Sequence, residues 1–150
     1  MQAEFDVAVD IAADPQTVWD VVTSWEEQGA WMPATTVRHL PGPRQSIGER
    51  FVARTGVGPL AFDDPITVTA WDPPHRCEIL HTGRIVRGVG AFYVEPLGTG
   101  SRFTWWERIA VPGGPLAPLL WRIGGPLTRA GFGWALRRLE RQIEADRLSV

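Results

Sequence analysis

The sequence has no lysine and only one cysteine, and each absence excludes particular kinds of catalysis or cross-link. All 15 basic residues are arginine, which excludes catalysis through a lysine Schiff base. A lone cysteine, Cys77, excludes an intramolecular disulfide and a thiolate metal cluster. Disulfide-poor chains are typical of reducing compartments, so we expect a cytoplasmic protein. Cys77 itself, without an adjacent general base to activate the thiol, is predicted to be a small buried apolar residue.

Long apolar runs, a targeting segment and an excess of positive charge are also missing. No stretch reaches the ~18 apolar residues of a spanning helix, and the start of the chain lacks a basic, apolar signal pattern. The formal charge of −2 does not fit a nucleic-acid binder. Metal-ligand spacings and nucleotide-binding glycine motifs are absent as well. We therefore expect no nucleic acid, no integral membrane association, no metal and no cofactor.

The sequence is instead rich in large aromatic rings. It contains eight Trp and six Phe against a single Tyr. Such rings bring area and shape without a hydroxyl group that needs a partner. A tryptophan-rich core and an aromatic-lined pocket are both consistent with this composition. At 150 residues and 44% hydrophobic content, the chain is predicted to form one domain, residues 1–150, with a real core.

Two short helices are predicted to follow the first strand. Apolar residues alternate over residues 4–11, which is typical of a half-buried strand. Asp14 and Pro15 then have the character of a helix N-cap and first helical residue. A second helical segment is expected over residues 24–31, ending before Pro33 because the residue before proline resists the helical region.

From residue 34 onward the hydrophobic period changes to two, which indicates strands. Six are predicted, at residues 35–40, 47–55, 66–71, 76–82, 88–95 and 101–110. The short, turn-forming separators imply antiparallel neighbours. Asp63 and Asp64, which precede Pro65, are expected to be turn caps, with a paired-carboxylate site as the alternative.

The last third of the chain predicts a long helix interrupted at Gly124-Gly125-Pro126, which is either a lid hinge or a static kink. One face of this helix is apolar: Thr128, Phe132, Ala135, Leu136, Leu139 and Ile143. Trp134 falls about 140° from that stripe, so it either packs on residues 115–123 or marks an oligomer contact.

Strand parity gathers several side chains on the inward face. The turns LGT and GRIV set these pairs opposite one another: Phe92 with Trp105, Gly90 with Glu107, Gly90 with Ile79, and Gly88 with His81. Two glycines on this face leave room between His81 and Glu107. At the ~4.8 Å strand spacing the two backbones lie roughly 10–12 Å apart, too far for contact unless both side chains lean inward.

Each polar residue on this face can also be interpreted as purely structural, without a role in binding or catalysis. An inward Glu107 needs a partner, and a structural pair with Arg54, Arg84, Arg87 or Arg122 is one expectation. His81 is open to interpretation as a satisfied core histidine or as a catalyst.

Five segments in order resemble a known superfamily: AADPQTVWDVVTSWEEQGAWMP, IGERFVART, VTAWDPPHRCEILHTG, GVGAFYVEPLGTGSRFTWWE and the terminal helix. The chain resembles START-like (SRPBCC) proteins, which include polyketide cyclases, dehydratases and lipid-transfer proteins. The resemblance implies an α+β helix-grip fold, in which a seven-stranded antiparallel sheet wraps around a long C-terminal helix. It also implies a deep hydrophobic pocket between the two.

We therefore predict that the chain binds a small hydrophobic ligand, similar to an aromatic polyketide or a lipid. The predicted ligand-binding residues are Trp31, Phe51, Ile79, His81, Gly88, Gly90, Phe92, Trp105, Glu107, Phe132 and Leu136. One alternative is a cyclase or dehydratase that uses His81 and Glu107 as acid and base. Another is an interaction module whose pocket is filled by its own indole rings. A homodimer is a further expectation.

Overall fold

In the computed structural model, residues 1–149 are described, and their seven strands form one antiparallel sheet. The strands are β1 (Gln2–Ile11), β2 (Thr35–His39), β3 (Arg50–Thr55), β4 (Phe62–Asp72), β5 (Arg76–Thr82), β6 (Arg87–Leu97) and β7 (Gly100–Ala110). They lie in the order β1-β7-β6-β5-β4-β3-β2. Helix α1 (Pro15–Val22) and the 3-10 segment η1 (Trp25–Ala30) follow β1. The 3-10 turns η2 (Gly58–Leu60) and η3 (Gly114–Leu116) precede β4 and the terminal helix α2 (Ala117–Leu148).

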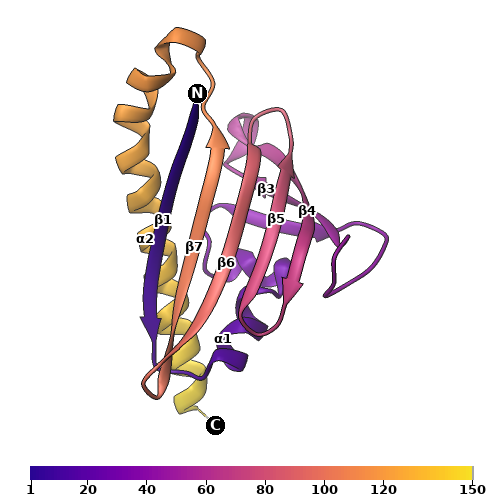
Figure 1. Ribbon diagram of the computed structural model, residues 1–150, viewed down its shortest axis with the longest axis vertical. Coiled ribbons are helices and arrows are strands. Elements are labelled where there is room, and N and C mark those ends of the chain that lie inside the picture. The colour runs from indigo at the N-terminus through magenta and orange to yellow at the C-terminus, as the bar shows by residue number, and fades with distance from the viewer. Residues whose placement is uncertain (150) are drawn as a thin grey trace.

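Helix α2 runs the length of the molecule beside β1, behind the curved sheet (Figure 1). Its inner face buries Ala135, Leu136, Leu139 and Ile143, as the apolar stripe predicted. The C-terminal end is held to the loop after β1, where the backbone N–H of Ala12 donates to Glu144 Oε1 at 3.0 Å. The helix-grip fold predicted from the sequence is confirmed.

Local signals explain the short helices. The backbone N–H of Thr17 donates to Asp14 Oδ1 at 3.2 Å, and Pro15 occupies the first helical position. The segment predicted over residues 24–31 forms the 3-10 turn η1, which buries Trp25 and Gln28. These two side chains face the sheet and not the solvent, so η1 forms part of the wall of the core.

The turn predicted at Asp63, Asp64 and Pro65 is wrong. Strand β4 begins at Phe62 and includes all three residues. Proline is tolerated there because Pro65 precedes the β4–β5 ladder, which starts where Ile66 pairs with His81. The two aspartates therefore point to opposite faces of the sheet.

The predicted interruption of α2 at Gly124-Gly125-Pro126 is also wrong, because the helix is continuous through Pro126. Packing and a side-chain bond override the local propensities. Thr128 Oγ1 donates to the Gly124 carbonyl at 2.8 Å, and Gly125 is buried against the indole of Trp121. A Cβ on Gly125 would lie 3.0 Å from that ring, so the glycine here serves packing and not bending.

The neighbouring glycines of α2 give a matched test of this packing. A Cβ at Gly124 would meet nothing within 4 Å, so Gly124→Ala should stabilise the protein by about 0.5–1 kcal/mol through helix propensity. Gly125→Ala should lose that gain because its Cβ crowds Trp121. Urea unfolding measures both. Equal stabilisation by the two variants would contradict the packing of Trp121 on Gly125.

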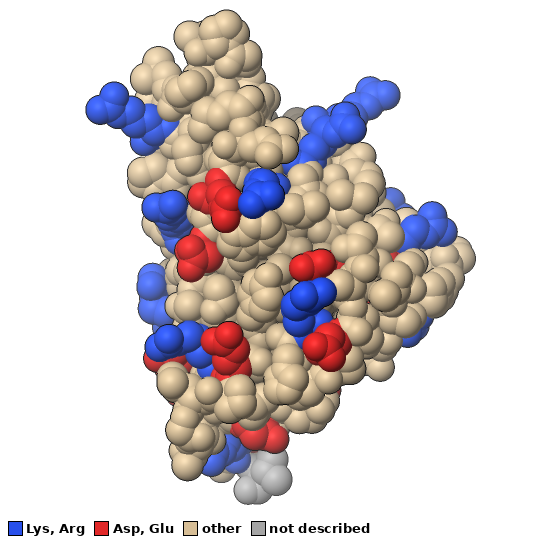
Figure 2. Space-filling view, viewed as in Figure 1, with Lys and Arg blue, Asp and Glu red and all other residues tan. Residues whose placement is uncertain are grey.

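The outer surface is mixed in charge but apolar at one end. Figure 2 shows acidic and basic side chains interspersed over the outer face, where Arg102 pairs with Asp10 at 2.8 Å. The turn η3 and the first half of α2 expose a run of apolar side chains: Leu116, Leu119, Leu120, Ile123 and Leu127. Trp134 is 41% exposed, and its ring lies 5.4 Å from the Arg138 guanidinium, away from residues 115–123. Of the helices within residues 1–149, none combines the length and apolar character needed to cross a membrane.

Candidate functional site

A cavity of about 440 Å³ lies between the sheet and α2. Its walls are largely aromatic, with rings from Phe5, Trp25, Phe51, Phe62, Phe92, Trp105 and Phe132. Several rings meet edge to face, among them Trp105 and Phe132 with centroids 4.7 Å apart. Exposed lining residues, Pro33, Leu127 and Gly131, mark the side where the cavity reaches solvent. The indole rings therefore do not fill the space, contrary to the pocketless alternative.

The structure brings most of the predicted binding residues to this cavity. Those that line it are Phe51, Ile79, His81, Phe92, Trp105, Glu107 and Phe132. Trp31 and Leu136 do not: both are buried in the core, where Trp31 packs edge-on against Trp105. Their roles are in the packing behind the wall.

The two glycines also lie outside the lining, for different reasons. Gly88 has φ +146°, and a Cβ there would meet the Arg108 carbonyl at 2.1 Å, so it permits close backbone approach and opens no space in the cavity. Gly90 lies directly beneath a carboxylate. A Cβ on Gly90 would be 2.8 Å from both carboxylate oxygens of Glu107.

Sequence reasoning missed Asp64, which lies at the polar end of the cavity. Asp64 is buried on the inward side of β4, in register with the apolar Ile66 and Val68. The same alternation that identified those two residues would have placed Asp64 beside them. The expectation that Asp63 and Asp64 cap a turn, with the strand beginning at Ile66, concealed this signal.

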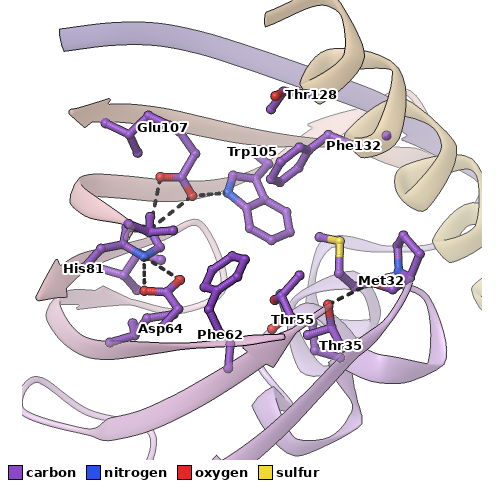
Figure 3. Close-up of a pocket in the computed structure, with 18 of the residues that line it drawn as sticks. Met32, Thr35, Thr55, Phe62, Asp64, His81, Trp105, Glu107, Thr128 and Phe132 are labelled. Atoms are coloured by element: carbon purple, nitrogen blue, oxygen red, sulfur yellow. Dashed lines mark hydrogen bonds and ion pairs between the residues drawn. The ribbon is translucent and has the colours of Figure 1, made fainter. Parts of the chain in front are cut away.

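Asp64, His81 and Glu107 form a hydrogen-bonded cluster at that end (Figure 3). His81 Nδ1 lies 2.9 Å from Asp64 Oδ2, and His81 Nε2 lies 3.1 Å from Glu107 Oε2. The indole N–H of Trp105 donates to Glu107 Oε1 at 2.6 Å. Asp64, His81 and Glu107 are all buried. The imidazole thus bridges two buried carboxylates.

Register and glycine together explain how His81 reaches Glu107. Gly90 on β6 pairs with Ile79 on one side and with Glu107 on the other, as predicted. The two polar side chains start on strands separated by β6. Since Gly90 has no side chain, the Glu107 carboxylate leans over it and closes the gap.

Glu107 has a different partner from the arginines that the sequence suggested. Arg54 instead pairs with Asp63 on the outer side, with Nη1 3.0 Å from Oδ1. The hydrogen bonds of the Glu107 carboxylate come from His81 and Trp105. This arrangement satisfies a buried acid within the wall of the cavity.

The cluster also sets the protonation of His81. Burial lowers the pKa of the imidazole, but the hydrogen bonds to Asp64 and Glu107 outweigh it and raise the pKa to about 10. His81 is therefore an imidazolium at neutral pH. Both of its N–H groups donate to carboxylates, which leaves the ring no nitrogen that can accept a proton.

The raised pKa of His81 predicts how stability depends on pH. The contribution is fully present below the unfolded pKa of 6.5 and is lost as pH rises through the folded value of about 10. We expect the free energy of unfolding to fall with a slope of up to about 1.4 kcal/mol per pH unit in this window. The absence of lysine leaves few other groups that titrate there. Urea unfolding at several pH values measures the slope, and His81→Gln should flatten it. An equal slope in that variant would contradict the assignment.

A third buried carboxylate, Glu49, holds parts of the wall together. Its Oε1 accepts from the Trp25 indole at 3.1 Å and from the Gln45 backbone at 2.9 Å. His39 Nε2 lies 3.2 Å from Oε2 without the alignment of a hydrogen bond. Glu49 thereby anchors η1 to the start of β3. Cys77 is buried, which raises the pKa of its thiol to about 12, and it does not line the cavity.

An antiparallel sheet gripping a terminal helix around an aromatic cavity defines a START-like protein. Residues 2–144 match the model of one family within this superfamily, polyketide cyclase / dehydrase and lipid transport, and the chain belongs to that family. No curated protein matches the chain.

Solved structures share the fold at low sequence identity. TTHA0849 from Thermus thermophilus is 16% identical, with a TM-score of 0.81 over 96% of this chain and 99% of that one. The di-domain ARO/CYC StfQ from the steffimycin biosynthetic pathway is 12% identical, with a TM-score of 0.79 over 100% of this chain and 53% of that one. Ara h 8.0201 is 13% identical, with a TM-score of 0.70 over 97% and 99%.

Proposed function

We propose that this protein binds a small hydrophobic molecule, similar to an aromatic polyketide or a lipid, in the cavity between sheet and helix. The observation that carries the proposal is the aromatic cavity of about 440 Å³ with one polar cluster in its wall. Apolar pockets with a few placed polar groups are typical of ligand sites. Membership of a family of cyclases, dehydrases and lipid-transport proteins supports the same function.

The size of the cavity favours a compact ligand. Pockets for drug-sized molecules span roughly 300–1,000 Å³, and this one is near the lower end of that range. Two or three fused rings, or one short acyl chain, suit this volume better than a lipid with two chains.

Binding is tested with a panel of aromatic polyketides, fatty acids and isoprenoids, read by thermal shift and by quenching of tryptophan fluorescence. Thr128→Phe places a ring in the cavity and should abolish the response, whereas Arg129→Phe, on the exposed side of α2, should preserve it. Native mass spectrometry of freshly purified protein would identify a copurified molecule. A panel without any response would refute the proposal.

A cyclase or dehydratase activity is the second candidate, supported by the family and by a carboxylate in an apolar cavity. The geometry favours Glu107 over His81 as the base, because the imidazolium has no free nitrogen for a proton. Glu107→Gln should then abolish turnover of a polyketide substrate while an uncharged aromatic probe still binds within a few fold. Binding without turnover in the parent protein favours the carrier.

We also propose a cytoplasmic location, a single domain over residues 1–150, no nucleic-acid partner and a homodimer. The exposed Trp134 and the apolar first half of α2 support the homodimer. Sedimentation at increasing concentration tests it, with Trp134→Ser as the variant expected to shift the protein towards monomer.

A further inference from the structure

We propose that the cavity selects apolar ligands that carry a hydrogen-bond donor, such as a phenol, an alcohol or an ammonium group, and rejects ligands that carry a carboxylate. The selecting element is the cluster Asp64–His81–Glu107. The inference rests on the proposed binding function and specifies the class of ligand.

The charge of the cluster is negative wherever its protons lie. Two short contacts join three groups, and each contact needs one hydrogen between its nitrogen and its oxygen. With both hydrogens on the imidazole, the charges are −1, +1 and −1. With one hydrogen moved to Asp64 or Glu107, they are 0, 0 and −1. The sum is −1 in every case, so a ligand group at this end meets net negative charge.

The donors at the polar cluster, and most others around the cavity, are already engaged. Both N–H groups of His81 and the indole N–H of Trp105 point at carboxylate oxygens. The Trp25 indole donates to Glu49, outside the lining. The hydroxyls of Thr35 and Thr128 donate to backbone carbonyls. A ligand acceptor at the cluster therefore finds no free donor there.

Cations are missing from the same wall. Among the described residues that line the cavity, none is an arginine, and the sequence contains no lysine. The imidazolium of His81 is enclosed by its two acids. The Gln28 amide and the Thr55 hydroxyl remain in the lining as neutral groups. A desolvated ligand carboxylate would lack the cation that a buried anion requires.

In contrast, the carboxylates of the cluster still have hydrogen-bond acceptor sites without a donor. A carboxylate offers about four lone-pair sites. Asp64 receives the single N–H of His81 Nδ1, and Glu107 receives one N–H from His81 and one from Trp105. Both acids are lining residues of the cavity. Figure 3 shows their oxygens beside the aromatic rings of Trp105 and Phe62, at the end of an otherwise apolar space. A ligand O–H or N–H can therefore form a charge-assisted hydrogen bond.

The test is a matched series that differs in one group: 2-methylnaphthalene, 2-naphthol, 2-naphthylmethylammonium and 2-naphthoate. A parallel decyl series of alcohol, ammonium and carboxylate covers chain-like ligands. At neutral pH we expect the naphthol and the ammonium to bind about tenfold tighter than the hydrocarbon, and the naphthoate about tenfold weaker, by calorimetry or competition.

The outcomes separate the two proposals. Carboxylates that bind as tightly as the alcohols, or equal affinities across a series, would overturn the donor selectivity and leave ligand binding intact. Failure of every compound in both series to bind would overturn the binding function and the selectivity with it.

Two neighbouring aspartates provide a variant and its control. Asp64→Asn changes the net charge of the cluster from −1 to 0, and it should raise the affinity for naphthoate relative to naphthol by about tenfold. Asp63→Asn removes the same charge one residue away on the outer face, and it should leave this ratio unchanged. An unchanged ratio in folded Asp64→Asn would overturn the proposal. If that variant does not fold, the affinities of the parent protein in the two series decide.

Discussion

His81→Leu is expected to lower the free energy of unfolding by about 3–5 kcal/mol. The substitution removes the bridging imidazolium and leaves Asp64 and Glu107 buried without their shared donor. Leucine fills much of the space, so the loss is electrostatic and not a cavity effect. Urea unfolding at pH 7 measures it.

A matched control for this variant is available in the same hairpin region. His75 is exposed and makes one side-chain contact, 3.3 Å from the Val94 carbonyl. His75→Leu should change stability by less than about 1 kcal/mol. Similar losses of unfolding free energy in the two variants would show that the buried carboxylates are not stabilised by His81. Restoration of stability in His81→Leu by a second change, Asp64→Leu, would support the electrostatic origin of the loss.

Gly90→Ala is expected to lower stability by about 2–4 kcal/mol, an unusually large effect for one methyl group. The new Cβ would lie 2.8 Å from the Glu107 carboxylate and force it off His81. Glu107 is flexible enough to move, so the steric term is small. The cost comes from a buried carboxylate separated from its partner. Chemical denaturation gives the stability, and the imidazole nitrogen shifts of His81 report whether the contact has been lost.

A double-mutant cycle distinguishes this mechanism from a general strain in β6. If Gly90→Ala acts through Glu107, its effect should shrink to about 1 kcal/mol or less in a Glu107→Gln background, because the charge that it displaces is already gone. Additive losses in the cycle would point to strain in the strand. Gly124→Ala, in an open position on α2, controls for a methyl group as such.

The strand register around the site could be predicted from the sequence, because hairpin turns fix which residues of neighbouring strands face each other. The turns GRIV and LGT align β5, β6 and β7, and parity then places His81, Glu107 and Trp105 on one face. The contact between His81 and Glu107 could not be predicted in the same way. It depends on two side chains leaning across Gly90, and register says nothing about rotamers.

The errors have a common physical origin, since local propensity was overruled by tertiary contacts. Pro65 has the character of a turn residue, but it lies where the ladder to β5 has not begun, and this hid Asp64. Gly124-Gly125-Pro126 has the composition of a helix break, but the Trp121 ring and the Thr128 hydroxyl hold the helix together. Propensity is a weak prior wherever packing is this specific.

The unbroken course of α2 determines how a molecule can reach the cavity. Because α2 has no flexible hinge beside the mouth of the cavity, access depends on rotation of side chains such as Leu127 and Met32. It does not depend on movement of a backbone segment. Such rotations take picoseconds to nanoseconds. Uptake should therefore be limited by diffusional encounter, so that stopped-flow rates rise linearly with ligand concentration and show no plateau.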